Sequence, residues 1–90
     1  MAVTVEEAVE IIEDVASFLD ADVNSPNVRY FAEMLIIIKG QKITHREWDK
    51  IDPIDRTIVY SEKKKGELIS KYRELINRAY DEVRSRVSKP

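Results

Sequence analysis

Apolar residues recur every three or four positions along most of the chain, which is the spacing of one face of an α-helix. In the first segment this stripe consists of Val5, Ala8, Val9, Ile11, Ile12, Val15, Ala16, Phe18 and Leu19. Thr4 and Glu7 have the spacing of a capping box, and Val3 and Ala8 have that of a hydrophobic staple. We therefore predict a helix over about residues 5–20, covered on more than one side because Ile11 and Phe18 widen its stripe.

A second helix is predicted over about residues 26–39. Ser25 supplies a capping hydroxyl, Pro26 suits the first helical position, and Lys39 followed by Gly40 is typical of a helix end. The expected inner face consists of Val28, Phe31, Ala32, Leu35 and Ile38, with Tyr30, Met34 and Ile37 beside it. The isoleucine-rich run also suits a buried strand, but no second strand is predicted with which it could pair.

The clearest local signal is a second capping box, formed by Thr44 and Glu47 with Ile43 and Trp48 as its staple. It predicts a short helix over residues 45–51, which Asp52-Pro53 interrupts because a residue before proline avoids the helical region. The same Asp52-Pro53 pair is a start signal for the next helix.

The sequence supports two interpretations of the C-terminal part equally well, one long helix or two shorter ones. A single stripe from Ile54 to Val87 keeps its phase across Gly66, as one long helix requires. Ser61 and Lys65 interrupt that face, however, and Gly66 after three lysines resembles a helix end, which gives helices over 53–65 and 67–87. In either case the chain is predicted to be an all-α bundle of three to five helices, forming a single domain over residues 1–90.

The composition indicates a globular protein without a membrane segment. Of the 90 residues 43% are hydrophobic and 36% are charged, and the longest apolar run, residues 34–38, is far shorter than the ~20 residues that span a bilayer. The absence of cysteine and of a secretory leader leads us to expect a cytoplasmic location. Scarce Gly and Gln beside abundant Glu, Lys, Arg and Ile favour a thermostable protein.

Charge is sorted along the chain, although the net charge is only −2. Residues 1–24 hold seven acids and no base, whereas residues 61–90 hold nine bases and five acids. If the first helix packs antiparallel beside residues 67–86, its acids meet Lys71, Arg73, Arg78 and Arg84, and internal pairing could satisfy the sorted charge. This arrangement leaves the cluster at residues 63–65 without an obvious internal counter-charge.

No residue pattern names a reaction, so the chain is not expected to be an enzyme and no catalytic residue, metal ligand or cofactor is predicted. His45 is the only histidine, and there is no glycine-rich phosphate loop, because Gly40 and Gly66 each suit a helix end. Residues 20–24 copy the opening of a calcium-binding EF-hand loop, but Ser25 replaces its glycine and Phe31 its bidentate glutamate. A helix end rich in turn-forming residues is the favoured interpretation of this segment.

Residues 40–69 are similar to the helix-turn-helix, plain or winged, of DNA-binding families. The helix after Thr44 would be the positioning helix, Asp52-Pro53 the turn, and the helix from Ile54 the recognition helix. The resemblance implies nucleic-acid contacts by Arg56, Thr57, Tyr60, Lys63, Lys64 and Lys65. Asp52 and Asp55 depart from the pattern because their charge repels phosphate, and helix is predicted where a wing strand would follow.

The preferred interpretation is a non-catalytic protein–protein interaction module, an accessory subunit or adaptor of a larger intracellular complex such as replication or transcription machinery. A bundle this small has few fully interior positions, so some of its apolar surface should remain exposed. The residue types enriched in binding hot spots are also present, as Trp48, Tyr60, Tyr72 and Tyr80. The alternative is a helix-turn-helix DNA-binding regulator with a C-terminal dimerisation helix. The predicted contacts with a partner protein or nucleic acid, direct or through the complex, are Arg56, Tyr60, Lys63, Lys64 and Lys65; a homodimer is a further option, and no membrane is expected.

Overall fold

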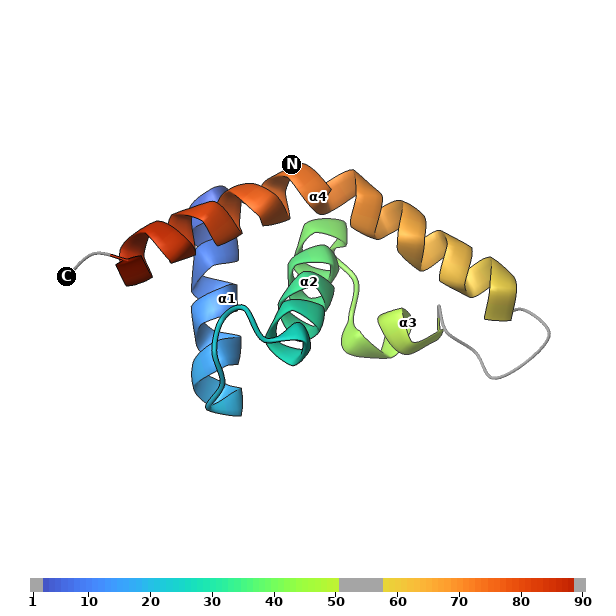
Figure 1. The fold of residues 1–90 in the computed structure, drawn as a ribbon. Coiled ribbons are helices and arrows are strands. Elements are labelled where there is room, and N and C mark those ends of the chain that lie inside the picture. The colour runs from blue at the N-terminus through green and yellow to red at the C-terminus, as the bar shows by residue number, and fades with distance from the viewer. Residues whose placement is uncertain (1–2, 51–57, 89–90) are drawn as a thin grey trace.

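The fold is an all-α bundle, as the apolar spacing predicts. The computed structural model describes residues 3–50 and 58–88, with side chains over 3–48 and 63–86. These residues form α1 (Val5–Leu19), α2 (Pro26–Gln41), α3 (His45–Lys50) and α4 (Ile58–Ser88), without a strand (Figure 1). The predicted helix starts at residues 5, 26 and 45 are confirmed, whereas residues 51–57 lie outside the described part.

The start and end of α1 are fixed by side chains that bond to the backbone. The predicted capping box is confirmed, because the N–H of Glu7 donates to Thr4 Oγ1 and the N–H of Thr4 donates to Glu7 Oε1, each at 3.1 Å. The helix ends at Asp20, whose backbone is left-handed with φ of 50°. Asn24 then donates its N–H to Asp22 Oδ1 at 2.8 Å, so residues 20–24 form the predicted turn.

Two predictions about the ends of α2 are wrong. Ser25 occupies the capping position, but its side chain makes no capping hydrogen bond, and Pro26 alone marks the start. Gly40 does not end the helix, which continues to Gln41 and closes at the left-handed Lys42. A β-carbon on Gly40 would lie 2.5 Å from the hydroxyl oxygen of Tyr72 in α4, so the glycine allows α4 to approach α2 closely.

The second capping box is also confirmed and fixes the start of α3. Thr44 donates its N–H to Glu47 Oε2 at 2.7 Å, and Glu47 donates its N–H to Thr44 Oγ1 at 3.1 Å. Trp48 is buried, and the ammonium of Lys65 in α4 lies 5.2 Å from the centre of its ring. This cation–π contact joins α3 to the N-terminal half of α4.

The C-terminal part is one helix, so the alternative with a break at Gly66 is wrong. Gly66 is exposed with open space where a β-carbon would stand, and α4 continues through it for 31 residues. At 1.5 Å per residue its length is about 46 Å, close to the 50 Å longest dimension of the molecule (Figure 1). The start expected at Pro53 lies outside the described residues.

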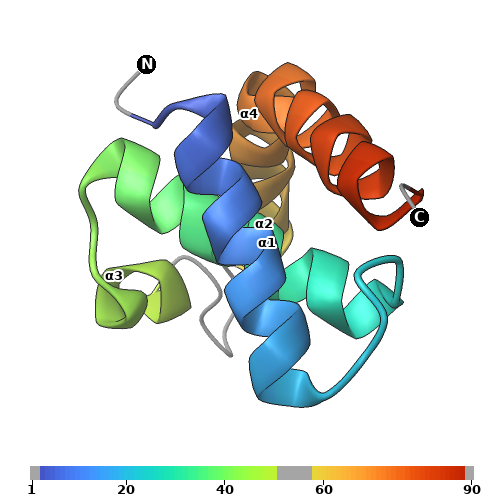
Figure 2. The ribbon, with the colours of Figure 1, turned by 90° about the vertical axis from the view of Figure 1, so that its left-hand side faces the viewer.

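A single core joins the helices. The C-terminal half of α4 crosses α1, and α2 lies against both (Figures 1 and 2). The buried hydrophobic residues are Val3, Ala8, Val9, Ile12, Val15, Val28, Ala32, Ile36, Ile37, Ile38, Trp48, Tyr72, Leu75, Ile76, Ala79, Tyr80 and Val83. Three consecutive isoleucines of α2 are buried because helices pack on it from more than one side.

The antiparallel packing that would pair the acids of α1 with Lys71, Arg73, Arg78 and Arg84 is not found, because α4 crosses α1 and does not run beside it (Figure 1). Glu7 pairs with Lys39 of α2 at 2.8 Å, and Glu13 pairs with Arg86 at 3.4 Å. The expected partners Arg78 and Arg84 pair within α4, with Glu74 at 3.0 Å and Asp81 at 3.6 Å. Such exposed pairs stabilise the fold by only about 0–1 kcal/mol each.

The two glycines offer a matched test of helix packing. Gly40→Ala is expected to lower the free energy of unfolding by about 1–3 kcal/mol, because the new methyl group would overlap the buried Tyr72 ring. Gly66→Ala is expected to raise it by about 0.5–1 kcal/mol, because Gly66 lies inside a helix with open space around it. Urea unfolding measures both changes, and a neutral Gly40→Ala would contradict the close approach of α4.

The ion pair between Glu7 and Lys39 should affect the pKa of the Glu7 carboxyl, which a titration can measure. The hydrogen bond from Lys39, followed by those from Thr4, lowers the pKa of the Glu7 carboxyl. A carboxyl pKa that is lower in the folded state stabilises the fold above the unfolded pKa, and this contribution is lost as the pH falls through the folded pKa. Lys39→Met should therefore raise the pKa of Glu7, measured by NMR of the carboxyl carbon, and should weaken the acid sensitivity of unfolding. Lys71→Met is the control, and a Glu7 pKa that does not respond to Lys39→Met would contradict the pairing.

Candidate functional site: an apolar groove between α1 and α2

Large apolar side chains are exposed around the end of α1 and the first half of α2. Among the described residues they are Phe18, Tyr30, Phe31 and Leu19, which are 89, 53, 40 and 36% exposed. The rings of Tyr30 and Phe31 meet edge to face with their centres 5.4 Å apart. Exposed apolar side chains that gather in one place, unlike single scattered ones, indicate an interaction surface.

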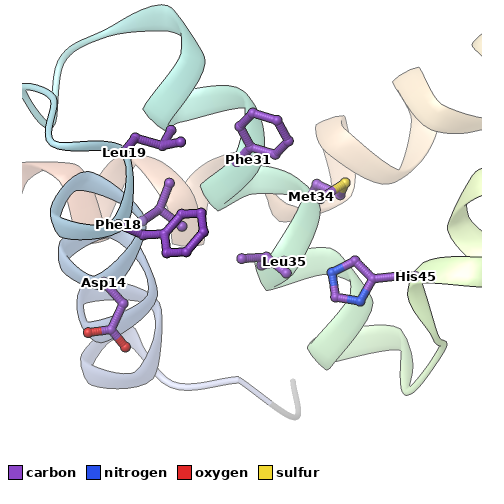
Figure 3. A pocket seen from close by; sticks show the side chains of 8 residues that line it. Asp14, Phe18, Leu19, Phe31, Met34, Leu35 and His45 are labelled. Atoms are coloured by element: carbon purple, nitrogen blue, oxygen red, sulfur yellow. The ribbon is translucent and has the colours of Figure 1, made fainter.

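Three of these side chains line a groove of about 450 Å³ between α1, α2 and the start of α3 (Figure 3). The lining consists of Asp14, Val15, Phe18, Leu19, Phe31, Met34, Leu35 and His45. Asp14 lies on the α1 side and His45 on the α3 side, with the apolar residues between them (Figure 3). The lining is therefore almost entirely hydrocarbon, with one charged residue and one imidazole at its edges.

The groove exists because each helix carries apolar residues beside its buried stripe. On α1, Val15 is buried, and Phe18 and Leu19 follow it by three and four residues, so they share its side of the helix. On α2, Phe31, Met34 and Leu35 have the same three- and four-residue spacing. The two rows face each other across the space between the helices (Figure 3).

The predicted inner face of α2 is confirmed at Val28, Ala32 and Ile38 but is wrong beside the groove. Phe31 was expected in the core but is exposed in the groove, Leu35 lines the groove while it also packs against the core, and Ile36 takes the fully buried position. Phe18, which widens the predicted stripe of α1, is left uncovered. The groove was missed in the sequence because its residues lie next to the core residues on the helical wheel, and a core and an open groove give the same periodicity. The excess width of the stripe at Phe18 was the one signal of it.

The α1 side of the groove is acidic. Asp14 lines it, and Glu10 lies one turn earlier on the same face of α1. Both acids are exposed, and neither has an ion-pair partner within the described part of the chain, in contrast to Glu7 and Glu13. Since the first 24 residues contain no base, no positive charge of α1 offsets them. On the α3 side His45 and the neighbouring Arg46 are exposed.

The contact residues predicted from the sequence lie elsewhere. Lys63 and Lys64 are exposed near the start of α4, at the opposite end of the molecule from α1 (Figure 1). Lys65 is half-buried over Trp48 and so has a structural contact. Arg56 lies outside the described residues, and Tyr60 lies in α4 with a side chain that is not described. Their role in binding stays a prediction.

The other candidate hot-spot aromatics belong to the core. Trp48, Tyr72 and Tyr80 are buried, and the guanidinium groups of Arg29 and Arg84 lie 4.9 and 5.4 Å from the centre of the Tyr80 ring. Burial raises the pKa of the Tyr80 phenol. Neither the Tyr80 hydroxyl nor the Trp48 indole N–H has a hydrogen-bond partner among the described residues.

The described residues offer little support for a metal site, a membrane-spanning helix or an acidic partner of His45. Across 3–50 and 58–88, no three His, Asp or Glu side chains come together in a group that could hold a metal ion. No helix within these ranges is both long and apolar enough to cross a membrane. His45 lies beside apolar side chains in the groove, and its only acidic neighbour in the lining, Asp14, is on the far side (Figure 3).

Comparison of the chain with protein-family models, with curated proteins and with solved structures finds no match. The groove between α1 and α2 is therefore the feature from which the function is inferred.

Proposed function

We propose that the chain is a non-catalytic protein-interaction module, an accessory subunit or adaptor that binds a partner protein through the groove between α1 and α2. The observation that carries the proposal is Phe18, a large aromatic side chain that is 89% exposed and lines an apolar groove. Exposing such a ring to water is unfavourable, and burying it against a partner would recover that free energy. The wider context, a complex that processes nucleic acids, is suggested only by the basic C-terminal third of the sequence.

The composition of the groove supports this proposal. Phe18, Phe31 and Met34 are residue types enriched where proteins meet, and Leu19 and Leu35 extend the apolar surface. Polar side chains at its edges, Asp14 and His45, resemble the polar rim of an interface around an apolar centre.

Phe18→Ser should abolish capture of the partner without harming the fold. Because Phe18 is exposed, the free energy of unfolding should change by less than about 0.5 kcal/mol. The loss of this aromatic contact should weaken binding at least about 30-fold. Affinity capture from the source organism followed by mass spectrometry identifies partners of the unchanged chain, and titration calorimetry with the purified partner measures the loss.

Tyr30→Ser is the matched control, because Tyr30 is also an exposed aromatic residue of this region but does not line the groove. It should retain most of the binding. Recovery of the same partner by Phe18→Ser with unchanged affinity would contradict the proposal.

A second candidate function, a helix-turn-helix DNA-binding regulator, is favoured by the exposure of Lys63 and Lys64 near the start of α4. Duplex DNA should then bind with an affinity that falls as salt rises, and Lys63→Ala/Lys64→Ala should reduce the slope of that dependence by up to about 2. Lys65 is left in place because it covers Trp48. Lys71→Ala/Arg73→Ala removes the same charge elsewhere on α4 and should have a smaller effect. Fluorescence anisotropy measures both, and absence of binding at low salt would rule out this alternative.

A further inference from the structure

We propose that the occupant of the groove is an amphipathic helix of the partner, with Lys or Arg along the edge that faces α1. This inference rests on the proposed function, because it specifies the chemistry of the segment that the groove binds. It follows from the lining of the groove, from the fold around it and from the charge along its α1 side.

The apolar lining favours a ligand whose backbone hydrogen bonds are already made. An extended or polyproline segment brings unpaired N–H and C=O groups, and such groups are costly to bury without partners. Along the groove only Asp14 and His45 could offer side-chain hydrogen bonds, and both lie at its edges (Figure 3). A helix satisfies its own backbone and presents only side chains, so it can occupy this groove without unpaired polar groups.

The fold also argues against addition of a strand. Extended peptides commonly bind by adding to the edge of a sheet. Between residues 3–50 and 58–88 the chain has no strand, so this mode has no edge to use. A helix, by contrast, would lie between the row that contains Phe18 on α1 and the row that contains Phe31 on α2 (Figure 3). It would insert apolar side chains spaced i, i+3 or i+4, and i+7, the usual anchors of a helix in a groove.

Charge decides which helix fits. Asp14 lines the groove on its α1 side and Glu10 lies one turn before it on the same face of the helix, so two exposed carboxylates lie there, with no base in the first 24 residues. A helix with Lys or Arg on the adjacent edge would be attracted, whereas one with acidic residues there would be repelled. On the α3 side, His45 and Arg46 make no such demand for positive charge. The basic residues of the ligand are therefore expected on one edge only.

The same carboxylates disfavour a lipid surface. Amphipathic surfaces that bind anionic membranes combine exposed apolar side chains with lysine and arginine. Here Phe18 is exposed one turn after Asp14, whose charge has the same sign as the lipid headgroups. A basic helix of a protein is thus the occupant that the surroundings of the groove favour.

Selection from a phage-displayed library of helical peptides tests the inference directly. The bait is the full chain, the library varies both the apolar and the flanking positions of one scaffold helix, and the Phe18→Ser variant is used for counter-selection. Enriched peptides should carry large apolar residues at i, i+3 or i+4, and i+7, with Lys or Arg beside them on one edge.

A charge exchange then tests the predicted edge with one synthetic peptide from the selection. Glu10→Lys/Asp14→Lys should weaken its binding by about threefold or more, and added salt should reduce this difference. Replacing the lysines of the peptide with glutamate should restore binding to this variant. Glu67→Lys/Glu74→Lys makes the same change of charge on α4, away from the groove, and should have a smaller effect.

The outcomes separate this inference from the proposed function. Neutral or acidic peptides that depend on Phe18 would overturn the basic edge and leave the interaction module in place. Failure to select any peptide that depends on Phe18 would overturn the helical occupant, and the capture experiment with the Phe18→Ser variant would still decide the proposed function. Self-association in sedimentation that is lost in Phe18→Ser would assign the groove to a second copy of the chain and also overturn the inference.

Discussion

The contact between Tyr72 and the backbone of α2 at Gly40 is the constraint on which the arrangement of helices depends. The ring occupies the space that any side chain at position 40 would need, and Gln41 donates a hydrogen bond to the Tyr72 hydroxyl at 2.9 Å. This close approach brings α4 onto α2 in the middle of the bundle, while α4 also packs across α1. Because α2 is enclosed in this way, its three consecutive isoleucines are all buried.

Local signals in the sequence predicted local structure well. Both capping boxes are made as their spacing indicates, and each places the start of a helix correctly. Their hydrogen bonds join residues only three positions apart, so they depend little on distant parts of the chain. The continuity of the stripe across Gly66 likewise predicted the course of α4 better than the glycine itself did, because packing along a helix outweighs the modest cost of one glycine.

Features that depend on distant parts of the chain could not be predicted in the same way. Gly40 looks like a helix end until Tyr72, more than thirty residues later, is placed upon it. Phe31 and Ile36 are both apolar residues of α2, and only the positions of α1 and α4 decide which one is buried. The candidate site is made of residues of this second kind, so the sequence pointed to the basic cluster near residue 64 and not to the groove.

The continuity of α4 has a consequence for any assembly that includes this chain. The helix extends from the neighbourhood of Lys63 and Lys64 to the part of the bundle that contains α1, over most of the 50 Å length of the molecule (Figure 1). A ligand in the groove and a second ligand at the two lysines would therefore be held apart by a nearly fixed distance, without touching each other. In mechanical terms the chain would act as a spacer, whose length is set by a single helix that bends near its middle (Figure 1).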